Sequence, residues 1–161
     1  MSAPQNFGDL GNQLQNIVVQ VLSNENIAKL LTYTESDNDP LSKPVVADPF
    51  GLKNTRLFTQ SYRPPTDTAG VFLCILMDDF KKANNIYFKW NTIKFMVIVH
   101  RDLWEISGNL RAFAIMHELD SLVNMERLQG MGKNWFKRCN YYTYNDLYNG
   151  YIIEYSGYDF S

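Results

Sequence analysis

The chain has 161 residues, of which 45% are hydrophobic and 14% aromatic, so one core can form without disulfides or a structural metal. Its 15 basic and 17 acidic residues give a formal net charge of -2, and neither sign forms a long block. These values exclude a chain that is disordered throughout and argue against a basic nucleic-acid-binding surface.

Two helices are predicted in the N-terminal region. In residues 10–22 the apolar side chains recur at spacings of three and four, which indicates one stripe of an amphipathic helix. Ser23 or Asn24 can cap a second, shorter helix, because both side chains accept hydrogen bonds from free backbone amides. The buried side of that helix is predicted to contain Ile27, Leu30 and Leu31.

Residues 34–54 have the composition of a long surface loop, with prolines, Asn and Asp but no sustained period. Residues 56–62 can form a short strand, and Arg63-Pro64-Pro65 then favours an extended or turning backbone. Residues 71–77 predict a buried strand that ends at Asp78 and Asp79.

The strongest hairpin signal lies in residues 85–100. Residues 85–90 alternate apolar and polar side chains, Asn91-Thr92 is typical of a tight turn, and residues 93–100 predict the returning strand. A second long helix is expected over residues 110–128, ended by Gly130 and Gly132, with Arg111, Glu118 and Glu126 in solvent.

The C-terminal region predicts two more strands, over residues 136–144 and 148–155, joined by a turn at Asn145-Asp146. We therefore expect a single α+β domain over residues 1–161, with a mainly antiparallel sheet of four to five strands packed against two main helices. Cys74 and Cys139 lie in apolar, strand-like sequence and are expected to be unpaired thiols in a reducing compartment.

No catalytic motif has the required spacing. His117-Glu118 resembles the start of a zinc-protease motif, but Ser121 stands where the second histidine must lie. Asp78 and Asp79, together with Glu118, could in principle bind Mg²⁺, since hard cations prefer several carboxylate oxygens. The simpler interpretation is a solvated strand end. No cofactor is expected, and neither a secretory signal nor a membrane span is recognised in the sequence.

Tyrosines cluster near the C-terminus and provide contact area at low entropic cost. A half-exposed sheet face accounts for many of them equally well. Combined with the proline segment, they suggest an interface between subunits. The candidate residues are Arg63, Pro64, Pro65, Tyr148, Tyr151 and Tyr155.

In its local sequence pattern the chain resembles the tail terminator family of tailed bacteriophages, small proteins that close the end of the tail tube. The likeness covers about half of the chain. It is carried by the strand of residues 93–100, by Gly108-Asn109-Leu110-Arg111 opening a helix, by residues 118–124 (Glu-Leu-Asp-Ser-Leu-Val-Asn), and by residues 148–155 of the last strand.

The resemblance implies a structural virion protein without enzymatic activity. It implies a homohexameric ring, assembled in the host cytoplasm, that caps the tail tube and meets neck and head-completion proteins. DNA would pass through such a ring without specific binding. Asp78 and Asp79 are the candidate lumen-facing acids, because like charges repel the DNA backbone.

Three other functions stay open. The chain could be another phage neck or head-completion protein with the same small fold. It could be a small metal-dependent phosphoesterase that uses Asp78, Asp79 and Glu118. It could also be a monomeric binding module or inhibitor that uses its tyrosine-rich sheet.

Overall fold

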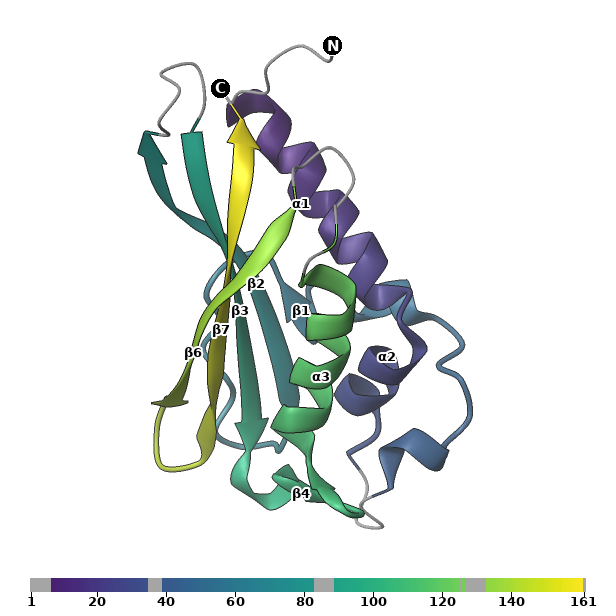
Figure 1. The fold of residues 1–161 in the computed structure, drawn as a ribbon. Coiled ribbons are helices and arrows are strands. Elements are labelled where there is room, and N and C mark those ends of the chain that lie inside the picture. The colour runs from purple at the N-terminus through teal and green to yellow at the C-terminus, as the bar shows by residue number, and fades with distance from the viewer. Residues whose placement is uncertain (1–6, 35–38, 83–88, 125, 127–132, 161) are drawn as a thin grey trace.

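The computed structural model describes residues 7–34, 39–82, 89–124, 126 and 133–160. It shows a five-stranded sheet whose helices all lie on one face (Figure 1). The strands, in their order across the sheet, are β1 (Leu57–Phe58), β2 (Val71–Lys82), β3 (Lys89–His100), β7 (Tyr148–Phe160) and β6 (Asn134–Thr143). Only β1 and β2 are parallel; the other neighbours are antiparallel.

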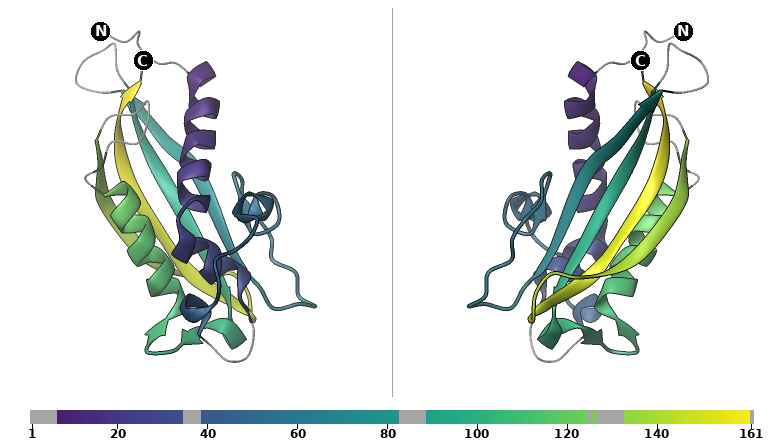
Figure 2. Two further views of the ribbon diagram at one scale, coloured as in Figure 1. Left: turned by 90° about the vertical axis from the view of Figure 1, so that its right-hand side faces the viewer. Right: turned by 90° about the vertical axis from the view of Figure 1, so that its left-hand side faces the viewer.

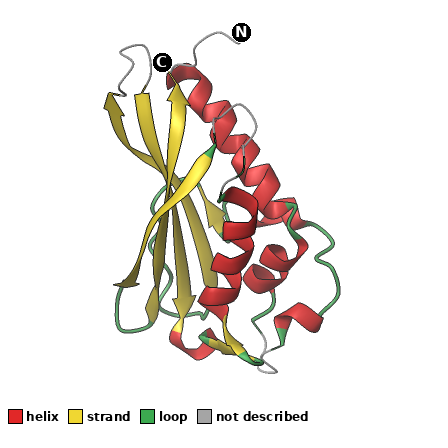
Figure 3. Ribbon diagram, in the orientation of Figure 1, coloured by secondary structure: helices red, strands yellow, loops and turns green. Residues whose placement is uncertain are grey.

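Three helices cover the sheet: α1 (Phe7–Leu22), α2 (Glu25–Thr32) and α3 (Arg111–Val123). Figure 3 separates this helical layer from the strands. A 3₁₀ helix, η3 (Arg101–Leu103), and a small two-stranded sheet, β4 (Glu105–Ile106) with β5 (Asn109–Leu110), connect β3 to α3. The predicted α+β class with a mainly antiparallel sheet is confirmed.

The main core lies between the helices and the inner face of the sheet. Alternate residues of each strand point inward, as the two-residue period of a strand requires. From the sheet, the core takes Leu73 and Ile75 of β2, Phe95 and Val97 of β3, and Ile153 of β7. The apolar stripe predicted for residues 10–22 packs on them, and the amide N–H of Ile27 donates to Asn24 Oδ1 at 2.9 Å. Asn24 is therefore the cap of α2.

A smaller apolar cluster occupies part of the outer face of the sheet, the face turned away from the helices. It contains Phe58, Phe72, Cys74, Ile98 and Tyr148. The chain between β1 and β2 covers it, and the ring of Tyr62 stacks on Phe58 with 3.9 Å between centroids. Burial raises the pKa of the Cys74 thiol to about 11, so it stays protonated at neutral pH.

The predicted turn at Asn91-Thr92 is wrong, because both residues lie inside β3. Thr92 pairs with Asp78 of β2 on one side and Ser156 of β7 on the other. Pairing with two neighbouring strands has overridden the local turn preference. The first predicted strand of the hairpin, residues 85–90, lies outside the described residues except for its last two.

β2 does not end at Asp78 and Asp79, as the sequence predicted, but continues to Lys82 through a bulge. Asp79 sits in this bulge with a φ of 57°, and aspartate tolerates that left-handed conformation better than most residues. The bulge lets an acidic pair, of which Asp78 is exposed and Asp79 half-buried, lie within a paired strand. β1 is shorter than predicted, since only Leu57 and Phe58 pair with β2.

α3 begins at Arg111 as expected but ends at Val123, where Asn124 is its C-cap. Gly130 and Gly132, the predicted stop, lie outside the described residues. The expectation that Arg111 is in solvent is wrong, because its side chain is completely buried. Residues 34–54 also contain two short 3₁₀ helices, η1 (Pro40–Ser42) and η2 (Pro49–Leu52), separated by an irregular segment.

Candidate functional site

The acidic pair Asp78-Asp79 lies within a group of basic side chains. Asp78 accepts a hydrogen bond from Lys94 of β3 at 3.1 Å. Asp79 forms ion pairs with Lys137 of β6 at 3.1 Å and Lys81 at 3.2 Å. Both carboxylates are therefore neutralised by lysines, two of which come from other strands of the sheet.

Glu154 forms the centre of this charged group on the outer face. Its carboxylate is bonded by Arg138 of β6, and Lys94 of β3 lies 3.5 Å away. The group contains three acids, Asp78, Asp79 and Glu154, and four bases, Lys81, Lys94, Lys137 and Arg138, so its net charge is +1 (4 − 3). This surface is not the acidic patch that repulsion of DNA would need; whether it faces a lumen stays a prediction.

The hydrogen bonds in this group change the pKa of each acid. The backbone amide of Asp79 and the ammonium of Lys94 lower the pKa of Asp78, and hydrogen bonds from Lys137 and Lys81 lower that of Asp79. Burial alone would raise the pKa of Glu154, but the bond from Arg138 and the charges of Arg138, Lys94 and Lys137 lower it overall. All three groups are therefore ionised at neutral pH.

Glu154→Gln is expected to lower the free energy of unfolding by about 1 kcal/mol at pH 7, because it removes a charge-assisted hydrogen bond that is only partly screened. The folded-state pKa lies below the ordinary 4.5, so this contribution is complete above pH 4.5 and is lost as the pH falls further. Urea unfolding at pH 7 and pH 3 should show the two proteins converging in acid. Glu105→Gln, at an exposed carboxylate, is the control and should change stability by less than about 0.5 kcal/mol.

The structure does not bring together the three acids of the predicted magnesium site. Glu118 of α3 accepts hydrogen bonds from the side-chain amides of Asn24 at 3.1 Å and Asn26 at 2.9 Å, whereas Asp78 and Asp79 bind lysines on the sheet. Within the described part of the chain, no three His, Cys, Asp or Glu side chains form a group that could hold a metal ion. The geometry thus gives the phosphoesterase hypothesis no support.

Two of the predicted interface tyrosines are core residues. Tyr148 and Tyr155 are both 0% exposed. The Tyr148 hydroxyl donates to the carbonyl of Thr68 at 2.7 Å, and the Tyr155 hydroxyl donates to Asp120 at 2.7 Å. Burial raises the pKa of both phenols, and for Tyr155 the hydrogen bond to Asp120 raises it further. Neither side chain reaches the surface of the protomer, so neither can form the predicted contact there.

The other candidates lie at two separate places. Arg63 is exposed, Pro65 half-buried and Pro64 buried, and Arg63 and Pro64 line a hollow of about 440 Å³ beside Tyr144. Tyr151 is half-buried on the inner face of β7, in contact with aromatic rings of other elements. The structure therefore does not assemble the predicted residues into one surface.

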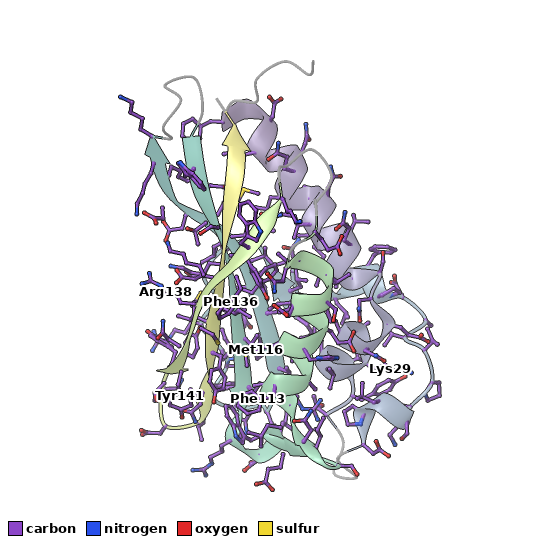
Figure 4. The ribbon with its side chains drawn as sticks, in the orientation of Figure 1. Lys29, Phe113, Met116, Phe136, Arg138 and Tyr141 are labelled. Carbon is purple, nitrogen blue, oxygen red and sulfur yellow. The ribbon has the colours of Figure 1, made fainter. Side chains whose placement is uncertain are left out.

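An aromatic surface that the sequence pattern did not predict lies where α3 meets the edge strand β6. Tyr151 packs against Phe113 of α3 at 5.2 Å, Tyr141 of β6 at 5.5 Å and Trp104 at 6.3 Å between ring centroids. Phe113 is 44% and Tyr141 56% exposed. Figure 4 shows these two labelled rings at the same end of the molecule, with Phe136 further along β6. We call Trp104, Phe113, Tyr141 and Tyr151 the aromatic shelf.

The aromatic shelf borders a hollow of about 640 Å³. The hollow also has charged walls, since Arg101, Asp102 and Glu105 contribute to it. The tyrosine-rich sequence of residues 141–151 was a signal for this surface. The decisive information, that β6 is the last strand of the sheet, is not present in the sequence pattern.

A second exposed apolar surface lies on residues 40–52. Its large apolar side chains are Leu41, Val45 and Phe50, and Val45 is 61% exposed. In the two side views of Figure 2 this segment projects from one flank of the molecule, whereas β6 lies on the other. The protomer thus has two different apolar surfaces on opposite flanks.

None of the helices in the described regions is long and apolar enough to cross a membrane. A family model described as YomW matches residues 24–156, which include everything from the cap of α2 to the greater part of β7. No curated protein matches the chain.

Proposed function

Because this chain belongs to the YomW family of phage-derived gene products and is phage-encoded, we propose that it is a structural virion protein, a tail terminator that forms a homohexameric ring. In this role the ring caps the tail tube and joins it to the neck and head-completion proteins. The chain acts through contacts with other proteins and carries out no reaction.

The observation that supports the proposal is the presence of two unlike apolar surfaces on opposite flanks. A closed ring of identical copies uses heterologous contacts, in which one surface of each copy binds a different surface of the next. The aromatic shelf beside β6 and the exposed Leu41, Val45 and Phe50 meet this requirement. Each contains large apolar side chains of the kind that is enriched at subunit interfaces.

The particular position at the end of the tail rests on the resemblance carried by residues 93–124 and 148–155. In the structure these residues form β3, α3 and most of β7, which are adjacent in the core. A different neck or head-completion protein is the alternative, because such a protein would use the same two surfaces.

The proposal is tested by deleting the gene from the phage that encodes it. Without a cap, growth of the tail tube is not stopped and heads have no surface to join. Electron microscopy of lysates should therefore show unjoined heads beside tails of irregular length, and plasmid expression of the chain should restore infectious particles. Tails of normal length that fail to join heads would favour another neck protein. Normal virions that lack the chain would contradict a structural role.

A further inference from the structure

The outer edge of β6 has backbone groups available for pairing. Among the described strands, β6 pairs only with β7. The amide N–H of Tyr144 donates to the carbonyl of Tyr148 at 3.0 Å, and hydrogen-bonded pairs alternate in an antiparallel ladder. By this alternation the N–H and C=O groups of Cys139, Tyr141 and Thr143 point away from β7. An edge of this kind is a template for another strand.

Side chains next to this edge would hold an added strand. Tyr141 and Phe113 of the aromatic shelf are both about half exposed, and Tyr151 and Trp104 support them from below. The side chains of a strand paired with β6 would lie over these rings on alternate residues. The edge therefore offers both backbone pairing and an apolar surface.

The opposite flank presents a segment suited to this edge. Residues 44–47, Pro-Val-Val-Ala, lie between η1 and η2 and include two β-branched valines. The Tyr33 hydroxyl anchors one end by donating to the carbonyl of Pro44 at 2.7 Å, and Asp48 is bonded to the amide of Gly51 at the other. No hydrogen bond from the described residues engages the backbone of residues 45–47.

We infer that neighbouring copies join by strand addition, in which residues 44–47 of one copy pair with the free edge of β6 in the next. This inference rests on the proposed ring. In the antiparallel register that places Val45 opposite Tyr141, Ala47 lies opposite Cys139. Val45 and Ala47 then pair with backbone groups that β7 does not use. Pro44 lies one residue before the first of these pairs, at a position where no N–H to β6 is needed, and its carbonyl is already bonded within its own copy.

Charge agrees with this register. β6 contains Lys137 and Arg138 but no acidic residue, and the register brings Asp48 of the incoming segment opposite Arg138. Two β6 strands paired about a two-fold axis would offer these bases no acidic partner, because β6 itself has none. The segment and the edge lie on opposite flanks, so the contact can repeat from copy to copy and close a ring.

The test uses two variants, one that disables the incoming segment and one that disables the edge of β6. Val45→Asp places a charge in the incoming segment, and Tyr141→Pro removes an outward N–H from β6 without removing a bond to β7. Wild-type protein should form a ring-sized species in light scattering after size exclusion, and each variant should be a monomer. An equimolar mixture of the two should give a dimer of twice the monomer mass, because one intact segment and one intact edge remain.

Val19→Asp is the matched control, since it makes the same change at a valine of α1 that is 49% exposed. It should assemble like the wild type. Circular dichroism checks that each variant is folded, and Tyr141→Asp, at an exposed side chain, replaces Tyr141→Pro if the proline variant does not fold.

Three results would overturn the inference: a wild-type chain that stays monomeric, variants that assemble normally, or a mixture that stays monomeric. Gene deletion and the composition of virions decide the proposed function independently. If virions require the chain but the Val45 and Tyr141 variants assemble normally, the proposed function stands and the proposed contact is wrong.

Discussion

Gly150→Ala is expected to destabilise the protein by about 3 kcal/mol or more, or to prevent folding. Gly150 lies in β7 and pairs with Ile98 of β3 on one side and Tyr142 of β6 on the other. A Cβ at this position would overlap the backbone carbonyl oxygen of Val97. Backbone atoms in the middle of a sheet cannot move aside as a flexible side chain can, so the clash must separate β7 from β3.

Urea unfolding followed by circular dichroism measures this effect, with Gly11→Ala as the control. Gly11 is an exposed residue of α1, and an added Cβ would have no heavy atom within 4 Å. Alanine is the better helix former, so this control should be more stable than the wild type by about 0.5–1 kcal/mol. If Gly150→Ala lowers the free energy of unfolding and Gly11→Ala raises it, the effect comes from the position and not from alanine itself. A Gly150→Ala protein of normal stability would contradict the β3–β7 register.

Arg111→Met is expected to cost about 3–5 kcal/mol of folding free energy, because it leaves buried acceptors without a donor. The guanidinium donates from Nε to the carbonyl of Leu103 at 2.9 Å, and from Nη1 to those of Leu30 at 2.8 Å and Tyr33 at 3.0 Å. These carbonyls belong to the end of α2 and to η3, so one side chain connects α2, η3 and α3. Burial lowers the pKa of Arg111 to about 10, which still leaves it charged at neutral pH.

Arg101→Met is the control for this substitution, since the Arg101 side chain is 63% exposed and its one ion pair with a described residue is with Asp102, at 3.8 Å. Its effect on urea unfolding should be within about 0.5 kcal/mol. The stability of Arg111→Lys should lie between those of the wild type and Arg111→Met. An ammonium lacks the fixed fork of donors with which the guanidinium reaches separate carbonyls. Equal stability of Arg111→Met and the wild type would mean that the carbonyls do not depend on this side chain.

Arg111 also affects the proposed contact between copies. It fixes the carbonyl of Tyr33, and the hydroxyl of the same tyrosine holds Pro44 at the start of the incoming segment. Two residues further along α3, Phe113 contributes to the aromatic shelf. One buried side chain thus positions elements of both surfaces, although it lies on neither.

Local patterns in the sequence were enough for the α+β class and for most of the elements. The three- and four-residue spacing places α1 correctly, and the apolar run of residues 71–77 gives the start of β2, because these periods follow directly from helix and strand geometry. The turn before Tyr148 was also predictable from the sequence, because Asn favours turns. In the structure the side chain of Asn145 accepts hydrogen bonds from the backbone amides of Leu147 and Tyr148, at 2.9 Å each.

Tertiary structure decided which side chains reach the surface. Tyr148, Tyr155 and Arg111 are of residue types common at interfaces or in solvent, yet each is buried and donates a hydrogen bond to a group distant in the chain. Likewise Asn91-Thr92 has turn composition but is held in β3 by strands on both sides. Partners remote in sequence leave no local period, so these residues could not be placed from the sequence alone. The strand order, which leaves β6 at the edge of the sheet, depends on the same long-range pairings, and it determines where another copy can bind.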